Sequence, residues 1–289
     1  MQETPIGWTD FSGNLIKYRD PDGNVVNACI KASEGCRHCY AETLAPRWGR
    51  KGKPFTAQNM KRLTPFFDEK EAKAILGSKK ISGKRFFHGD MTDWMGPWVS
   101  SDLIDRCLAT FAERSDVTFQ TLTKHAKRQR EYFTDSSLED RITELWQGDD
   151  EDRKTWNVML PLENLHVGVS VEDQPNALKR IPELISMPAA VKWVSVEPML
   201  GAVDLGVSHS YQARHGGFRS LMDDLNGIVI GGESGPGHRE MPLPAALMLA
   251  ESARAAGVAV YFKQDSGARP GKQGRVPDDI WALKDWPTQ

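Results

Sequence analysis

The stretch Leu165-His166-Val167-Gly168-Val169-Ser170-Val171-Glu172 is a run of apolar and β-branched residues that ends on a carboxylate. This composition is typical of a buried β-strand. Apolar residues then recur at helical spacing between positions 178 and 185, and residues 191–197 form the next β-branched run. A strand, a helix and a strand in succession indicate parallel pairing through a right-handed crossover. This unit predicts an α/β fold.

The same alternation continues on both sides of this unit. Further strands are expected at residues 85–90, 117–124, 228–232 and 258–262, and helices at residues 40–48, 68–76, 101–111 and 243–256. We expect a single β/α barrel of the TIM type, complete or partial, over residues 1–264, with residues 265–289 as a tail packed on it. A doubly wound open sheet is the alternative fold. Its support is the glycine-rich run 231–237, which could cradle a phosphate but lacks the G-x-G-x-x-G spacing.

Composition places the chain among globular proteins. Its 289 residues suffice for one large domain with a sizeable core. Hydrophobic residues make up 39% and charged residues 26%, and no run approaches the roughly 20 apolar residues of a membrane span. The N-terminus lacks the basic and apolar segments of a secretion signal, so we expect a cytoplasmic protein without a membrane partner. The net charge of -2 offers no general footprint for nucleic acid, and only the basic runs at 79–85 and 124–130 keep such a partner open.

Three of the four cysteines lie in one loop that we expect to follow the first barrel strand: Cys29, Cys36 and Cys39. Three thiolates on one loop can hold three irons of a cubane cluster and leave the fourth iron open to a small chelating molecule. Zinc is the alternative, with these cysteines and His38 or His88 as a tetrahedral structural site, and a loop without metal is a third. Cys107 shares a helical face with apolar residues and is expected in the core.

Each predicted strand ends in a polar or charged residue. In a barrel of parallel strands these ends meet on one face. We therefore expect the following residues around the cysteine loop: Asp90, Lys124, Glu172, Glu197, Glu233, Lys263 and Gln264. Charges at a partly buried rim must be paired, so some are expected to form ion pairs across the barrel mouth. As a set they predict a functional site.

Six segments carry a resemblance to known families: IGWTD (6–10), GCRHCYAE (35–42), VGVSVE (167–172), VSVEPMLG (194–201), VIGGESG (229–235) and YFKQ (261–264). The cysteine loop resembles the cluster-binding loop of radical S-adenosylmethionine (SAM) enzymes. The longer pattern, which spans nearly the whole chain, resembles the phage Gp37/Gp68-like family, an uncharacterised family related to them. Six residues separate Cys29 from Cys36, where the commoner radical SAM loop has three, and this longer gap fits the Gp37/Gp68-like pattern.

The resemblance implies an iron–sulfur enzyme. The three cysteines would hold a [4Fe-4S] cluster, and SAM would be cleaved reductively to a 5′-deoxyadenosyl radical that acts on an unknown substrate. An electron donor such as a flavodoxin or ferredoxin is implied as well. The candidate SAM-binding residues are Asp90 and Asp93, at the amino group, and Lys124, Ser170, Glu172, Glu197, Gly231 and Gly232. Glu233 and Lys263 would meet substrate charge or transfer a proton.

A second function stays open beside this one. It is a non-enzymatic, zinc-stabilised barrel that binds nucleic acid or a partner protein. Residues 206–226, the long link between the predicted fifth and sixth strands, would be a lid or an insertion.

Overall fold

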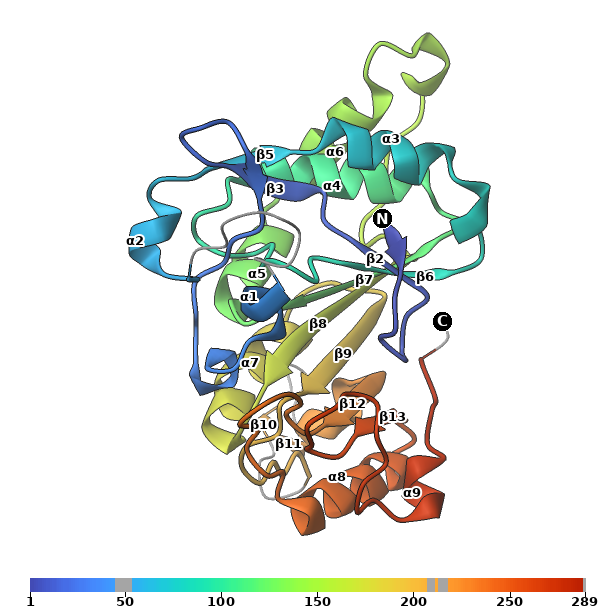
Figure 1. Ribbon diagram of the computed structural model, residues 1–289. Helices are drawn as coiled ribbons and strands as arrows, with labels where there is room; N and C mark the ends of the chain where they lie inside the picture. The colour runs from blue at the N-terminus through green and yellow to red at the C-terminus, as the bar shows by residue number, and fades with distance from the viewer. Residues whose placement is uncertain (45–53, 207–210, 213–217, 288–289) are drawn as a thin grey trace.

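The computed structural model of this protein describes residues 1–44, 54–206, 211–212 and 218–287. Its centre is an eight-stranded sheet in the order β1-β2-β6-β7-β8-β9-β12-β13 (Figure 1). The strands are β1 (Gln2–Glu3), β2 (Phe11–Gly13), β6 (Arg85–His88), β7 (Thr118–Thr123), β8 (Leu165–Val171), β9 (Val191–Val196), β12 (Gly227–Gly231) and β13 (Ala259–Gln264). β1 and β2 pair antiparallel, and every other neighbouring pair is parallel.

The sheet is open, so the predicted closed TIM-type barrel is wrong. The strands curve into a half-barrel, and their parallel part follows the order of the sequence without the reversal of a doubly wound sheet (Figure 1). The two edges of the sheet are formed by β1 and β13. β1 runs antiparallel at one edge, and the C-terminal segment lies along β13 at the other. There the Phe262 N–H donates to the Leu283 carbonyl (2.9 Å) and the Asp285 N–H to the Val260 carbonyl (3.0 Å).

A separate antiparallel sheet carries the cysteine loop. It pairs β4 (Val25–Val26), β3 (Ile16–Arg19) and β5 (Thr64–Phe67), in that order. The loop follows β4 of this small sheet and not the first strand of the main sheet, which overturns the predicted placement. The reason is local: Gly23, at a φ of 83°, closes a tight turn from β3 into β4, so this segment forms a hairpin instead of a parallel barrel strand.

Helices pack on the outer face of the half-barrel (Figure 1). The helices of the described ranges are α1 (Tyr40–Leu44), α2 (Ala57–Met60), α3 (Glu69–Gly77), α4 (Ser101–Glu113), α5 (Ala126–Phe133), α6 (Leu138–Gln147), α7 (Gln174–Ile185), α8 (Leu243–Ala255) and α9 (Asp278–Trp281), with short 3-10 turns η1 (Glu34–Cys36), η3 (Lys79–Ile81), η4 (Glu151–Arg153) and η6 (Leu221–Asp224). Alternate residues of each strand face these helices, as Val167, Val169 and Val171 do in β8. Cys107 of α4 is fully buried among them, as predicted. In these ranges no helix combines the length and apolarity needed to cross a membrane.

Two predicted segments lie partly outside the described residues. The predicted helix 40–48 is described as far as Leu44, where α1 ends. Of the predicted lid 206–226, the structure describes residues 206, 211–212 and 218–226, in which β10 (Tyr211–Gln212) pairs antiparallel with β11 (Phe218–Arg219).

An aromatic layer fills the inner face of the half-barrel below the strand ends. It consists of Trp8, Phe87, Trp193 and Trp286. Trp8 stacks on Trp286 with ring centroids 5.6 Å apart, and Trp193 occupies the space over Gly168, where a Cβ would lie 2.5 Å from its ring. The layer removes large apolar surface from water.

Candidate functional site

The cysteine loop lies against the carboxyl ends of the parallel strands. Figure 1 shows it, with α1, in front of the ends of β7 and β8. The Tyr40 hydroxyl donates to the Asp90 carbonyl after β6 (2.5 Å), and His38 Nδ1 lies 2.9 Å from Glu233 after β12. A Cβ on Gly35 would lie 3.3 Å from Cδ of Glu172, so the backbone of the loop rests on the end of β8. Three strand ends therefore position one loop.

The three loop thiols lie close enough together that Cys36 raises the pKa values of both Cys29 and Cys39. Cys29 and Cys39 pack against the same small apolar cluster of Ala41, Phe55 and Met91. Burial raises the pKa of the Cys29 thiol, and the nearby Cys39 and Cys36 add to the rise. Burial also raises the pKa of Cys39, although N–H groups at the start of α1 oppose the rise. Both thiols therefore need a metal or another positive charge to act as thiolates at neutral pH.

The loop thiols, as the structure places them, do not form a site for a single metal ion within the described residues. Among the described residues, no three Cys, His, Asp or Glu side chains converge on one ion position. Tetrahedral zinc with Zn–S bonds of about 2.3 Å brings its sulfur ligands within roughly 4 Å of each other. Cys29, Cys36 and Cys39 are all free thiols and half-buried.

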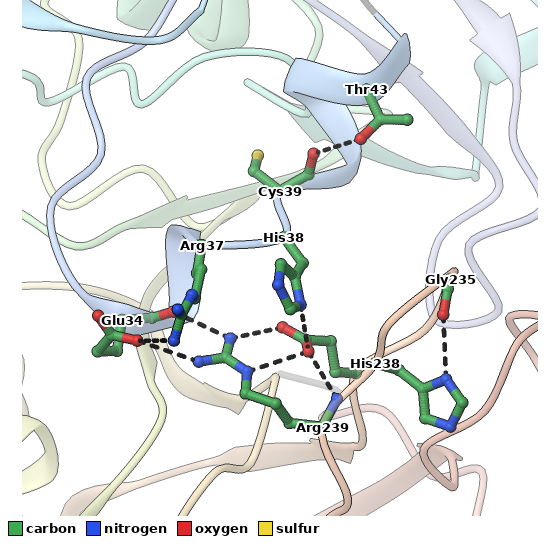
Figure 2. Close-up of polar contacts among 9 residues, drawn as sticks. Glu34, Arg37, His38, Cys39, Thr43, Gly235, His238 and Arg239 are labelled. Atoms are coloured by element: carbon green, nitrogen blue, oxygen red, sulfur yellow. Dashed lines mark hydrogen bonds and ion pairs between the residues drawn. The ribbon is translucent and has the colours of Figure 1, made fainter.

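Neither histidine proposed for zinc stands with the cysteines in such a group. His88 is fully buried on the helix side of the sheet, edge-on to Trp94 and Phe111 at centroid distances of 5.7 and 5.5 Å. Its prediction as a metal ligand is therefore wrong: β6 alternates its side chains, and His88 shares the face of Phe86. His38 turns its ring toward Glu233 (Figure 2).

A chain of polar contacts links the ends of β7, β8, β9 and β13. Lys124 Nζ donates to Ser170 Oγ (2.7 Å), and Ser170 Oγ donates to the Glu197 carbonyl (3.2 Å). The Glu197 carboxylate pairs with Lys263 Nζ at 2.5 Å. A Cβ on Gly231 would lie 3.2 Å from Cδ of Glu197, so this glycine leaves room for the carboxylate. Five of the predicted site residues thus lie together.

Within this chain, Lys124 differs from Lys263 in its partner. Lys263 is neutralised by a carboxylate, whereas Lys124 Nζ donates to a hydroxyl within the described ranges. Lys124 also lies near Cys39, whose thiol pKa it lowers slightly against the effect of burial. The site therefore holds a cationic group beside the loop that can receive a carboxylate or phosphate.

Asp90 and Asp93 both accept hydrogen bonds from neighbouring groups of the chain. Asp90 accepts hydrogen bonds from Ser12 Oγ (2.9 Å) and Asn14 Nδ2 (2.5 Å), which tie β2 to the end of β6. Burial raises the pKa of Asp90, and these two donors partly offset the rise. Asp93 accepts from Thr123 Oγ1 (2.6 Å) and from the Lys124 N–H (2.9 Å). Both carboxylates stand beside the site and hold its strands in place.

Glu172 forms a buried ion pair under the cysteine loop. Its side chain is 0% exposed and that of Arg180 is 5% exposed, with Nη1 and Oε2 2.8 Å apart. Arg180 Nη1 also donates to the Ser170 carbonyl (2.7 Å). The other Glu172 oxygen, Oε1, is buried and has no hydrogen-bond partner within the described part of the chain. An oxygen of this kind can accept a bond from a ligand or from a rearranged loop.

The Glu233 carboxylate is contacted by Arg239 and His38, which are labelled in Figure 2. The carboxylate accepts from Arg239 Nη2 (2.6 Å), Arg239 Nε (3.1 Å) and the Arg239 N–H (2.8 Å). Burial alone raises the pKa of Glu233, but the bonds from Arg239 and His38 lower it to about 2. Glu233 is therefore a carboxylate at neutral pH, held by an arginine. Gly232 brings this segment against β13, since a Cβ there would lie 2.2 Å from the Ser266 nitrogen.

Sequence reasoning missed both arginines that organise the site. Arg180 falls on the apolar face of α7 with Ala177, Ile181 and Leu184, and a charged residue in such a stripe signals a buried ion pair. Arg239 follows the glycine-rich turn six residues after Glu233, where no local pattern shows that it reaches back to Glu34. The first could have been found from the sequence, and the second needs the fold.

Comparisons with known proteins assign a family and no activity. A search of curated proteins and a search of solved structures find no match. A family model described as "Protein of unknown function (DUF5131)" matches residues 13–278, which include the cysteine loop and every strand end described above. No link to radical SAM enzymes or to the phage Gp37/Gp68-like family comes from these comparisons. The chain belongs to the DUF5131 family of proteins of unknown function.

Proposed function

We propose that this protein is a radical SAM-type iron–sulfur enzyme in which Cys29, Cys36 and Cys39 hold a [4Fe-4S] cluster. The observation that carries the proposal is the placement of three free thiols on one loop against the carboxyl ends of parallel strands. Ligands of parallel α/β sheets bind at these ends. The resemblance of residues 35–42 to a radical SAM loop, and of longer segments to the phage Gp37/Gp68-like family, adds support.

A cluster with SAM at its open iron supplies one-electron cleavage of the sulfonium, which yields a 5′-deoxyadenosyl radical. The reductant would be a protein such as a flavodoxin or ferredoxin. The chain's own residues bind and orient the ligand. Lys124 would receive the SAM carboxylate, because its ammonium group faces a neutral hydroxyl. Ser170, Glu197 and Gly231 would line the nucleoside side, where Gly231 leaves room for the Glu197 carboxylate.

The remaining residues would exclude water and place charge. The aromatic layer closes the inner face below Ser170 and Lys263, so a ligand at the strand ends is shielded from one side. Lys263, paired with Glu197 at 2.5 Å, would meet substrate charge or move a proton between the two groups. Glu172 would offer a ligand donor its Oε1, which has no hydrogen-bond partner among the described residues. The contacts of Glu233 with Arg239 favour a positioning role over proton transfer.

Anaerobic reconstitution with iron and sulfide tests the proposal. We expect brown protein that absorbs at about 400 nm, as cysteine-bound clusters do, with iron and sulfide bound per chain. Cys36→Ala should lose the absorbance, while Cys107→Ala, which changes a buried cysteine of α4, should keep it. Colourless protein with one zinc per chain, lost in Cys36→Ala, would contradict the proposal and leave the loop a structural zinc site.

A further inference from the structure

We infer that Arg239 and Glu233 are positioning residues that dock the turn η1, with Cys36, onto the end of β12. The turn lies far from Glu233 and Arg239 in sequence, and it meets them because the hairpin of β3 and β4 carries the loop across the strand ends. The inference rests on the proposed function for the role of Cys36 as a cluster ligand. The docking itself rests on contacts of the chain alone.

The guanidinium group of Arg239 bridges Glu233 and the turn. Nη2 donates to the Glu34 carbonyl (3.0 Å) and to Glu233 Oε1 (2.6 Å), and Nη1 reaches Glu34 Oε2 (3.3 Å). The Glu233 carboxylate also lies 2.9 Å from His38 Nδ1. Figure 2 shows the arginine between the turn and the segment after β12. We call Arg239, Glu233 and His38 the clamp.

The clamp attaches the loop on both sides of Cys36. One attachment is at residue 34, two positions before Cys36, and the other is at residue 38, directly before Cys39. Both attachments end on the same carboxylate, directly or through the guanidinium group. Movement of Glu233 therefore moves both attachments together, so the spacing of Cys36 and Cys39 from the sheet depends on one buried carboxylate.

Among the described residues the turn has few other contacts, chiefly that of Gly35 with Glu172 at the end of β8. Ser33 makes no side-chain cap at its start, and its own bonds are Cys36 N–H to the Ser33 carbonyl (2.9 Å) and Arg37 N–H to the Glu34 carbonyl (3.0 Å). No residue of η1 is buried in the core. A 3-10 turn of this length is marginal without outside contacts. The clamp supplies these contacts.

Arginine suits this role better than lysine. Its planar fork donates to a carboxylate and to a carbonyl at once and loses little rotamer freedom for each bond formed. A lysine at position 239 could reach Glu233 or Glu34 but not span both with fixed geometry. Arg239→Lys is therefore a conservative variant, which should weaken the docking less than Arg239→Ala does.

The test compares Arg239→Ala, Glu233→Gln and Arg239→Lys with Arg37→Ala. Arg37 is the matched control, because it lies on the same turn, is 65% exposed and contacts Glu34 only at 3.7 Å. In metal-free protein we would measure hydrogen exchange of the Cys36 and Arg37 amides and alkylation of Cys36 by iodoacetamide. Loss of hydrogen bonds to a charged group should accelerate both rates roughly ten- to hundredfold in Arg239→Ala and Glu233→Gln. Arg239→Lys should fall between these variants and the wild type, and Arg37→Ala should match the wild type.

Two further readouts separate docking from general destabilisation. Amides of β8 and β9 should exchange at wild-type rates in every variant, because their ladder does not involve the clamp. After reconstitution, Arg239→Ala should bind less iron and absorb less at about 400 nm than Arg37→Ala. Wild-type exchange and alkylation rates in both Arg239→Ala and Glu233→Gln, or equal acceleration in Arg37→Ala, would overturn the inference. Accelerated rates in Arg239→Ala and Glu233→Gln, together with a wild-type protein that binds no iron after reconstitution, would uphold the docking and overturn the proposed function alone.

Discussion

The buried pair of Glu172 and Arg180 links the stability of the fold to the site. Both side chains are almost completely excluded from water, and Arg180 Nη1 bonds both to the carboxylate (2.8 Å) and to the Ser170 carbonyl (2.7 Å). Arg180→Met keeps an apolar stem of similar length and removes every donor. The carboxylate of Glu172 then stays buried without a countercharge. Removing one partner of such a pair costs about 3–5 kcal/mol in the free energy of unfolding.

Urea denaturation measures this loss directly. With a slope of about 3 kcal/mol per molar urea, a loss of 3 kcal/mol lowers the unfolding midpoint by about 1 M. The double variant Arg180→Met with Glu172→Met removes both charges and should be less destabilised than Arg180→Met alone, because an apolar pair fills the space without a buried charge. A cost below about 1 kcal/mol for Arg180→Met, or a double variant that loses the sum of the two single losses, would refute the reasoning.

Three further predictions concern single groups. The pKa of Asp265 is lowered from 3.8 to about 2 by hydrogen bonds from Arg275, so its stabilisation of about 2 kcal/mol is present above pH 4 and lost between about pH 4 and 2. Urea unfolding of Asp265→Asn should therefore approach that of the wild type as the pH falls, and a constant gap from pH 6 to 2.5 would contradict this. Burial lowers the pKa of His88 from 6.5 to about 3. Below pH 6.5 the unfolded chain therefore binds a proton at His88 that the folded chain does not bind, and the free energy of unfolding should fall as the pH drops. His88→Phe removes two buried nitrogens without partners in the described ranges, so its free energy of unfolding should rise by about 1 kcal/mol at pH 7. It should also lose less stability at pH 5 than the wild type. A loss of stability at pH 7 would count against this. Lys124→Met should weaken SAM binding to reconstituted protein roughly ten- to hundredfold in equilibrium dialysis, while Lys127→Met, at an exposed position of α5, should bind like the wild type; equal binding by all three proteins would exclude Lys124 from the SAM site.

The parallel core of the fold is largely predictable from local patterns. Buried β-branched runs identify β7, β8, β9 and β12 to within a residue or so, because strands covered by helices must be apolar along their length. Closure of the sheet into a barrel is not predictable from such local patterns. Whether β13 meets a first strand depends on the antiparallel β1 and on the tail at Leu283, which no single segment specifies.

The same division applies to the site. Residues at strand ends, such as Lys124 and Glu197, are predictable because parallel strands align their carboxyl ends. Their partners are not, because they come from other parts of the chain: Arg239 reaches Glu34 across 205 positions. The sequence predicts that Glu233 meets substrate charge or transfers a proton, and its contacts with Arg239 favour positioning. Contacts between residues so far apart in sequence are set by the fold and not by residue type.

The most direct test of the account is formation of 5′-deoxyadenosine from SAM. Anaerobically reconstituted protein would be reduced chemically in the presence of SAM, with Cys36→Ala and Cys107→Ala treated in parallel. We expect 5′-deoxyadenosine from the wild type and from Cys107→Ala, and none from Cys36→Ala. Intact SAM in a wild-type sample that carries a full complement of reduced cluster would contradict it.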